Sequence, residues 1–267
     1  EVTTALPSIS LEDLAPGVYT IKIKARSTNE ELTDSKYSFS AVVVDDSIRA
    51  LGALAKAYDR MTDHRKVAIT GSVGKTTTKE FVAATLAEAF RVHKTEGNFN
   101  SNIGMPLSML SKSEESEISV LEMGMSNFGE IERMSLVAEP DIAVITNIGS
   151  SHMETLGDRE GIFRAKLEVL CGLKKDGYLV LNGDQPILSR VGGRSYHTLY
   201  VSVKRPNADF FAQNIRVALG GTHFDVIYKG TTYPDFFIPV SGRHNVYAAL
   251  FAFAVVWFFS RPLTLMF

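Results

Sequence analysis

Alternating apolar and polar positions mark the beginning of the chain. Apolar side chains take every second position from Tyr19 to Ala25 and again from Tyr37 to Ala41, with polar residues between them. A period of two is typical of strands with one buried face, and the polar stretch between the two runs is typical of a loop. Residues 1–42 are therefore predicted to contain a β-hairpin.

The pattern changes from Val43 onward to a helical period. Apolar residues recur at Ile48, Leu51, Leu54 and Tyr58, which predicts a connecting helix within residues 43–64. Ser47 stands directly before this segment and is predicted to be its N-cap, because serine oxygens accept hydrogen bonds from the first free N–H groups of a helix.

Short apolar runs then alternate with helical patterns. The runs lie at 67–70, 118–121, 142–145 and 178–181, and the helix candidates at about 76–90, 101–111, 127–137 and 158–171. Continuous apolar strands separated by helices predict a mostly parallel sheet with helices on both faces, a three-layer α/β fold. The pattern of residues 196–240 is more typical of strands.

Composition narrows the class of protein. The formal net charge of -2 gives no basic field for nucleic acid, and the single cysteine, Cys171, excludes an internal disulfide, which fits a reducing compartment. The longest apolar run, Val246 to Phe259, is shorter than the ~20 residues of a membrane span, so we expect a buried helix there and no membrane span.

A glycine-rich segment after the first apolar run carries the clearest chemistry. It reads Gly71, Ser72, Val73, Gly74, Lys75, Thr76 and lies between a strand and a helix, the context of a phosphate-binding loop. Lys75 can reach nucleotide phosphates and Thr76 can hold Mg²⁺. The full Walker spacing would place glycine at position 69, where the chain has Ile69, so the loop is a shortened form. The alternative is a strand–helix turn with a surface lysine.

The shortened loop with Thr76 and Thr77 resembles the Mur ligase family, and further motifs follow in that family's order. They are the loop from Thr95 to Pro106, the stretch Glu122 to Met125 with Gly129 to Ile131, the stretch Thr146 to Gly149, then His152, the stretch Ala165 to Glu168, and Gly242 to Asn245. The resemblance covers about residues 43–256 and implies a central ATP-binding domain at 65–259, with an unmatched tail at 260–267. The stretch from Leu14 to Val42 resembles the last hairpin of a fibronectin type III-like module; a diverged remnant of another domain is the alternative.

The resemblance implies an ATP-dependent, amide-forming ligase of peptidoglycan synthesis. Within the family, the motifs resemble most the branch that adds D-alanyl-D-alanine to UDP-N-acetylmuramoyl-tripeptide, which would be the two partners. ATP would phosphorylate a carboxylate, and an amine would displace phosphate from the acyl phosphate. The implied protein is a bacterial cytoplasmic monomer that uses ATP and two Mg²⁺ ions.

The family's metal and phosphate ligands map onto four positions. Thr76 and Glu122 would bind the first Mg²⁺ and His152 the second, while Asn147 would contact ATP or metal. Each has a plainer alternative: a strand-end carboxylate facing solvent for Glu122, a loop histidine for His152, and a turn or capping asparagine for Asn147. The ATP contacts expected in this way are Gly71, Ser72, Val73, Gly74, Lys75, Thr76, Thr77, Asn147, His244 and Asn245.

Lys166 falls on the apolar side of its predicted helix, between Ile162 and Leu170, while Arg164 and Glu168 fall opposite. A buried lysine tends to lose its proton, and a neutral amine is nucleophilic. By resemblance, Lys166 would react with CO₂ to give a carbamate that supports Mg²⁺, so Lys75, Lys166 and His152 form the expected catalytic set. The alternative is a lysine that extends its ammonium to water.

Two further motifs would contact substrates. By resemblance, the segment Arg243, His244, Asn245 contacts the adenine, with Asn245 as the N-cap of the apolar helix as a further role. Asn98, Asn100 and Asn102 are expected to bind the substrate.

The family's flanking domains are not recognisable as a whole, so the sequence also allows a non-catalytic ATP-binding fragment. Apolar surface around Trp257, Phe258 and Phe259 would then be exposed. A second alternative is another superfamily ligase such as folylpolyglutamate synthetase.

Overall fold

The computed structural model describes residues 17–25, 35–191 and 196–260 and divides into two compact units, Glu1–Ala50 and Leu51–Phe267. In the first unit, β1 (Gly17–Ala25) pairs antiparallel with β2 (Ser35–Val43), from Gly17 opposite Val43 to Ala25 opposite Ser35. The predicted β-hairpin is thus confirmed. Its origin, as a fibronectin-like module or a remnant, stays a prediction, and the residues before Gly17 lie outside the described part.

Helix α1 (Ser47–Asp59) confirms the predicted helix but not its predicted cap. Asp46 Oδ1 accepts hydrogen bonds from the backbone N–H of Ile48 and of Arg49, both over 3.0 Å. The N-cap is therefore Asp46 and not Ser47. Both residue types are good caps, and the carboxylate lies one position earlier, within reach of the two donors.

The second unit is built on a nine-stranded sheet in the order β11-β10-β9-β8-β7-β6-β3-β5-β4. Neighbours from β4 to β9 run parallel, and β10 and β11 extend the sheet antiparallel. The mostly parallel sheet is as predicted, and the strand-like stretch 196–240 forms its last four strands. The strands are β3 (Arg65–Thr70), β4 (Val92–Lys94), β5 (Ile118–Glu122), β6 (Ile142–Ile145), β7 (Tyr178–Asn182), β8 (His197–Ser202), β9 (Phe210–Ala218), β10 (Gly221–Tyr228) and β11 (Thr231–Ile238).

Alternate residues of the central strands feed two separate cores. Val67 and Ile69 of β3 pack on one face, and Ala68 between them packs on the other. Because both faces are covered, apolar residues follow one another without alternation through the middle of these strands, which explains the continuous apolar runs.

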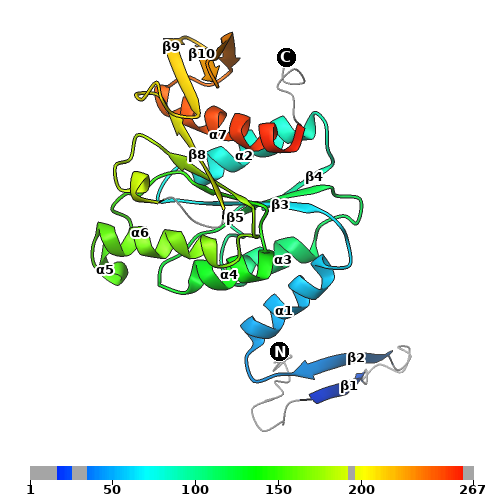
Figure 1. Ribbon diagram of the computed structural model, residues 1–267. Coiled ribbons are helices and arrows are strands. Elements are labelled where there is room, and N and C mark those ends of the chain that lie inside the picture. Colours follow the sequence, from blue (N-terminus) through cyan, green and yellow to red (C-terminus); the bar gives the residue numbers. More distant parts are fainter. Residues whose placement is uncertain (1–16, 26–34, 192–195, 261–267) are drawn as a thin grey trace, which may run out of the picture. The chain divides into compact units, whose positions relative to one another are not determined.

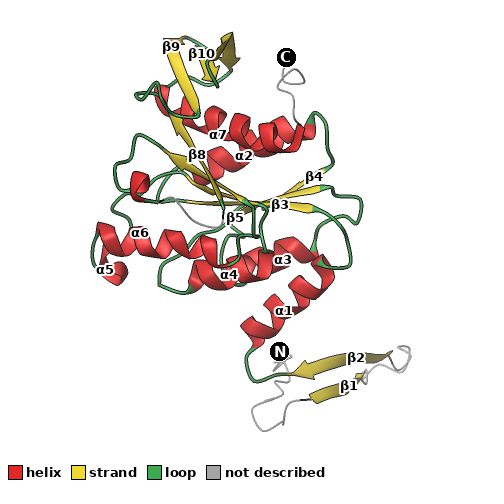
Figure 2. Ribbon diagram, in the orientation of Figure 1, coloured by secondary structure: helices red, strands yellow, loops and turns green. Residues whose placement is uncertain are grey.

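Helices α2 and α7 cover one face, and α3, α4 and α6 the other (Figures 1 and 2). The helices are α2 (Lys75–Ala87), α3 (Gly104–Leu110), α4 (Glu130–Ala138), α5 (Met153–Leu156), α6 (Arg159–Leu167) and α7 (Arg243–Ser260), with short 3₁₀ turns η1 (Glu168–Cys171) and η2 (Leu188–Arg190). The predicted helix at 158–171 is α6 followed by η1, and the three-residue strand β4 escaped prediction.

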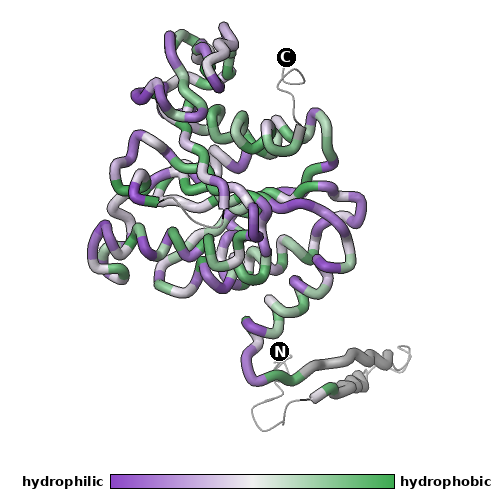
Figure 3. Tube along the Cα trace, viewed as in Figure 1, coloured by the Kyte–Doolittle hydropathy of each residue, from purple (hydrophilic) through white to green (hydrophobic). Residues whose placement is uncertain are grey.

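Helix α7 is the predicted buried helix and is hydrophobic along most of its length (Figure 3). Its residues from Ala248 to Val256 are buried against β7–β10 and α2. No helix among the described residues is long and apolar enough to cross a membrane. The expected exposure around Trp257, Phe258 and Phe259 is confirmed only in part, because all three pack on the same core and are partly buried.

Candidate active site

Two glycines shape the loop between β3 and α2. Gly71 has a φ of 146° and Gly74 a φ of 78°, both in the region that residues with a Cβ rarely adopt. A Cβ on Gly71 would stand 2.0 Å from Thr146 Oγ1, so the loop lies tightly on the segment that follows β6.

Residues of that segment form hydrogen bonds with backbone groups of the loop. Asn147 Oδ1 accepts from the N–H of Val73 over 3.0 Å, the carbonyl of Asn147 accepts from the N–H of Ser72 over 3.1 Å, and Thr146 Oγ1 donates to the carbonyl of Val73 over 2.7 Å. Asn147 therefore has the turn-holding role that was its alternative, and its side chain also lines the neighbouring cavity.

The start of α2 suits an anion. No side chain caps the helix after Gly74, so the free N–H groups and the positive helix end face the loop. Lys75 Nζ donates to the carbonyl of Gly71 over 3.0 Å. Burial lowers the pKa of Lys75, and Glu122 opposes that effect. Thr76 and Thr77 are exposed in the first turn.

Glu122 does not face solvent, contrary to its plainer alternative. Its side chain is 2% exposed, Oε1 accepts from Asn100 Nδ2 over 2.9 Å, and Oε2 is buried with no hydrogen bond. A buried carboxylate oxygen without a donor is costly unless a cation completes it. Asn100 holds this carboxylate, and its expected contact with substrate stays a prediction.

Lys166 is buried in α6, as the helical pattern indicates, and 2% of the residue is exposed. Burial, and then the charge of Lys75, lower the pKa of Lys166 from 10.5 to about 7, with Glu168 and Glu130 opposing. Within the described residues its ammonium makes no hydrogen bond or ion pair. The burial of the residue fits its place on the apolar helix face, and an ammonium extended to water stays the alternative.

His152 is exposed and lies at the N-cap of α5 with a φ of 67°. In the described part of the chain, no group of three histidine, cysteine, aspartate or glutamate side chains is placed to hold a metal. Mg²⁺ commonly binds through one or two carboxylates together with substrate phosphates, so Glu122 and Thr76 fit such an ion without a full protein cage.

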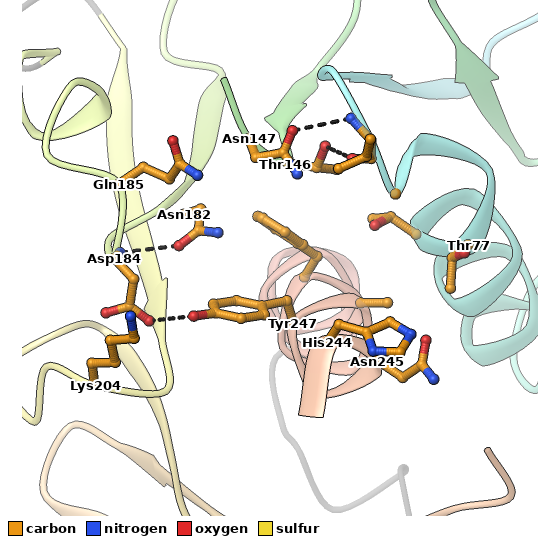
Figure 4. A pocket seen from close by; sticks show the side chains of 15 residues that line it. Thr77, Thr146, Asn147, Asn182, Asp184, Gln185, Lys204, His244, Asn245 and Tyr247 are labelled. Carbon is orange, nitrogen blue, oxygen red and sulfur yellow. Dashed lines mark hydrogen bonds between the residues drawn. The ribbon is translucent and has the colours of Figure 1, made fainter. Parts of the chain in front are cut away.

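A cavity of about 550 Å³ opens beside the phosphate loop (Figure 4). It is lined from four directions: the loop and α2, the segment after β6, the loop after β7 with Lys204, and the first turns of α7. Its lining residues are Val73, Gly74, Thr77, Thr78, Thr146, Asn147, Asn182, Asp184, Gln185, Lys204, His244, Asn245, Tyr247, Ala248 and Phe251. The phosphate loop and the Arg243–Asn245 segment, far apart in sequence, thus share one cavity.

Asn245 does not cap α7. The helix already begins at Arg243, and Asn245 Nδ2 donates to the carbonyl of Ser241 over 3.1 Å. This bond holds the amide at the cavity wall, with His244 beside it (Figure 4).

The wall opposite α7 was missed by sequence reasoning. Asp184 accepts hydrogen bonds from Ser202 Oγ (2.6 Å), from the N–H of Val203 (2.9 Å) and from Tyr247 OH (2.7 Å). These bonds tie the loop after β7 to the end of β8 and to α7. The one available signal was the polar Asn182–Gln185 stretch directly after a buried strand, where sites of α/β folds gather.

The structure does not gather every expected residue. Asn98 is exposed, and Asn102 is partly buried with an Oδ1 that lacks a hydrogen bond. Neither lines the cavity, nor do Glu122, His152 and Lys166. Those three stay predictions for a metal and substrate region beyond the phosphate loop.

Comparisons with known proteins agree with this geometry. The model of the Mur ligase middle domain matches residues 69–256. A UDP-N-acetylmuramoyl-tripeptide–D-alanyl-D-alanine ligase of Bacillus subtilis is 47% identical over 220 residues, covering 82% of this chain and 47% of that protein.

Solved structures give the same picture. MurF from Acinetobacter baumannii superposes with a TM-score of 0.78 at 28% identity, over 85% of this chain and 50% of that one. MurF from Thermotoga maritima, in complex with ADP, superposes with a TM-score of 0.74 at 31% identity, over 81% and 50%. The chain thus spans about half the length of the relatives it matches.

Proposed function

Because the chain belongs to the Mur ligase family, whose middle-domain model matches residues 69–256, we propose that it is the ATP-binding core of the ligase that joins D-alanyl-D-alanine to UDP-N-acetylmuramoyl-tripeptide. The observation that carries the proposal is the uncapped start of α2 at a tight glycine loop, opening into a cavity next to His244 and Asn245. The 47% identity to a Bacillus subtilis enzyme of that name favours this substrate pair over the folylpolyglutamate alternative.

The phosphates of ATP lie, in this proposal, on the Gly71–Gly74 loop. Lys75 turns from the carbonyl of Gly71 to the β- and γ-phosphates, where a fixed cation offsets the negative charge. The C-terminal carboxylate of the tripeptide then attacks the γ-phosphorus and displaces ADP, which gives an acyl phosphate. The amine of D-alanyl-D-alanine attacks the acyl carbon, displaces phosphate and loses a proton as the amide forms. The carboxylate and the phosphoryl group are both anions and repel each other. The main task of the residues is therefore to supply positive charge that offsets this repulsion.

The base and ribose of ATP occupy the 550 Å³ cavity. His244 offers a ring and Asn245 an amide at the start of α7, and the Asp184 network fixes the opposite wall. Thr77 and Asn147 line the cavity on the side of the phosphate loop, and Lys204 lines it beside Asp184 (Figure 4).

Two Mg²⁺ sites belong to the proposal. Glu122, whose Oε2 accepts no hydrogen bond, and the exposed hydroxyl of Thr76 would hold the first, and His152 with a carbamylated Lys166 the second. When bound, Mg²⁺ supplies positive charge on the transferring phosphoryl oxygens. Because imidazole is an unusual partner for so hard a cation, the second site rests more on resemblance than the first.

Carbamylation of Lys166 is supported by its environment. A pKa of about 7 leaves much of the amine neutral near neutral pH, and only the neutral amine attacks CO₂. The product would replace a cation that repels Lys75 with an anion that attracts it.

We further propose that the protein acts as a monomer in the bacterial cytoplasm, where UDP-linked precursors are made, and so contributes to cell-wall formation, cell shape and division. The alternative, a fragment that binds ATP without catalysis, makes a different prediction. Phosphate release is measured with both substrates, and then with each omitted. Release that needs ATP, UDP-N-acetylmuramoyl-tripeptide and D-alanyl-D-alanine together supports the ligase. ATP binding without substrate-dependent release supports the fragment.

A further inference from the structure

Lys79 is a fully buried cation that the proposed chemistry does not use. It lies one helical turn after Lys75 on α2 and is 1% exposed. Its Nζ donates to the carbonyl of Thr95 over 2.7 Å and lies 3.3 Å from Glu80 Oε1. Lysine is rarely buried so deeply unless a specific charge partner requires it.

Glu122 is one of the charge partners of Lys79. Lys79 Nζ stands 3.8 Å from Glu122 Oε2, which is too long for a hydrogen bond but close enough for a strong attraction between buried charges. The bond to Thr95 holds the ammonium at this distance, and Thr95 Oγ1 also accepts from the N–H of Glu122 over 3.0 Å. Lys79 thus balances the carboxylate while leaving Oε2 without a donor.

A second lysine faces the same carboxylate. Glu122 raises the pKa of Lys75 against the lowering by burial, so the two charges interact. Lys75 nevertheless donates to the carbonyl of Gly71 and forms no ion pair with Glu122. Residues i and i+4 share a helix face, so α2 presents two cations to one buried anion.

We propose that Lys79 is a positioning residue, the resident counter-ion of Glu122, which prevents Glu122 from capturing Lys75 and so keeps Lys75 available for phosphate. The inference rests on the proposed nucleotide site. A buried carboxylate that loses its partner takes the nearest other cation, because an unpaired buried charge is costly. Without Lys79, that cation is Lys75, and the loop loses its phosphate ligand before any metal is present.

The test is a double-mutant cycle in which calorimetry measures the affinity for ATP. EDTA is present, so that neither metal binding nor turnover contributes. Lys79→Met should weaken ATP binding about tenfold, the value of one charge-assisted contact. Glu122→Gln with Lys79→Met should bind ATP within about twofold of Glu122→Gln alone, because Lys79 acts only through the carboxylate. Lys94→Met, which removes a surface cation paired to Glu80, is the matched control and should bind as wild type.

The inference is overturned if Lys79→Met binds ATP with wild-type affinity. It is also overturned if the double variant binds ATP more weakly than Glu122→Gln alone. If Lys79→Met does not fold, the comparison of the double variant with Glu122→Gln still decides, because neither contains an unpaired buried carboxylate. Wild-type protein that binds no ATP would instead overturn the nucleotide site itself.

Discussion

Tyr247 donates its hydroxyl hydrogen to Asp184 Oδ2 over 2.7 Å, joining the first turns of α7 to the loop after β7 across the cavity (Figure 4). Burial, and then the hydrogen bond to Asp184, raise the pKa of Tyr247 well above its ordinary value, so the hydroxyl keeps its proton at any working pH. The bond therefore sets the spacing of two cavity walls whose joined residues are 63 positions apart in the sequence.

Tyr247→Phe should weaken ATP binding by about threefold to tenfold, because one hydrogen bond contributes ~1 kcal/mol and its loss loosens the cavity wall. Isothermal calorimetry with MgATP measures the change. Tyr178→Phe, at the other end of β7 from the cavity, is the control. Equal affinity in all three proteins would contradict a role for the bond in nucleotide binding.

Lys75→Ala should reduce ATP affinity at least ~10-fold, because the phosphates lose a fixed cation while the loop backbone remains. The exposed Lys175→Ala changes net charge equally and should bind as wild type. If both variants bind ATP with wild-type affinity, the Gly71–Thr76 loop is not the phosphate site.

The buried Lys166 makes stability depend on pH in a defined direction. Its pKa falls from 10.5 in the unfolded chain to about 7 in the folded one, so between these values the unfolded state binds more protons. Stability therefore rises with pH across that window, by about 2 kcal/mol from pH 7 to pH 9 relative to Lys166→Met. Urea unfolding in CO₂-free buffer measures the difference, and parallel pH curves for the two proteins would argue against it.

Carbamylation of Lys166 should be visible directly. Carbon-13 NMR with labelled bicarbonate and Mg²⁺ is expected to show one carbamate signal in wild type and none in Lys166→Gln. Lys174→Gln, at an exposed lysine paired to Asp141, should keep the signal. Wild type without the signal would leave Lys166 as an unmodified amine.

Local order along the chain was enough to predict part of this site. The phosphate loop needs only a strand, two glycines and a helix in sequence, so the sequence alone predicts it at Gly71 to Thr76. The helical period placed Lys166 on the apolar face of its helix, but it left open whether the ammonium is buried or extended to water. The sheet with helices on both faces followed from apolar runs, because strands covered on both sides have no polar face.

Contacts between distant segments could not be predicted. Tyr247 and Asp184 are 63 residues apart, and nothing in either segment indicates the other. Lys79 follows Lys75 by one helical turn, but its partners Thr95 and Glu122 lie elsewhere in the chain, so its role could not be predicted. The motif of Asn100 predicts a substrate contact, but it does not indicate that the amide of Asn100 donates to Glu122. Asp46 and Ser47 are neighbouring candidates for the N-cap of α1. The period of apolar residues does not fix the first residue of a helix to within one position, so it could not decide between them.

Gly71→Ala should disable the phosphate loop while leaving the fold intact. A Cβ at this position would lie 2.0 Å from Thr146 Oγ1 and 3.1 Å from the backbone nitrogen of Asn147, and the φ of 146° is itself unfavourable for alanine. The loop must then move away from Thr146, which breaks the bond from Thr146 to the carbonyl of Val73. Gly97→Ala is the matched control, since it also has a positive φ but open space around the added methyl group. Both variants should lose ~1 kcal/mol or more of folding stability through backbone strain, as chemical unfolding would measure.

The affinity for ATP should separate the two variants. We expect a loss of at least about tenfold in Gly71→Ala, because the displaced N–H groups no longer converge on the phosphates, and little change in Gly97→Ala. Equal ATP affinity in the two variants would mean that the close approach of Gly71 to Thr146 does not shape the phosphate site.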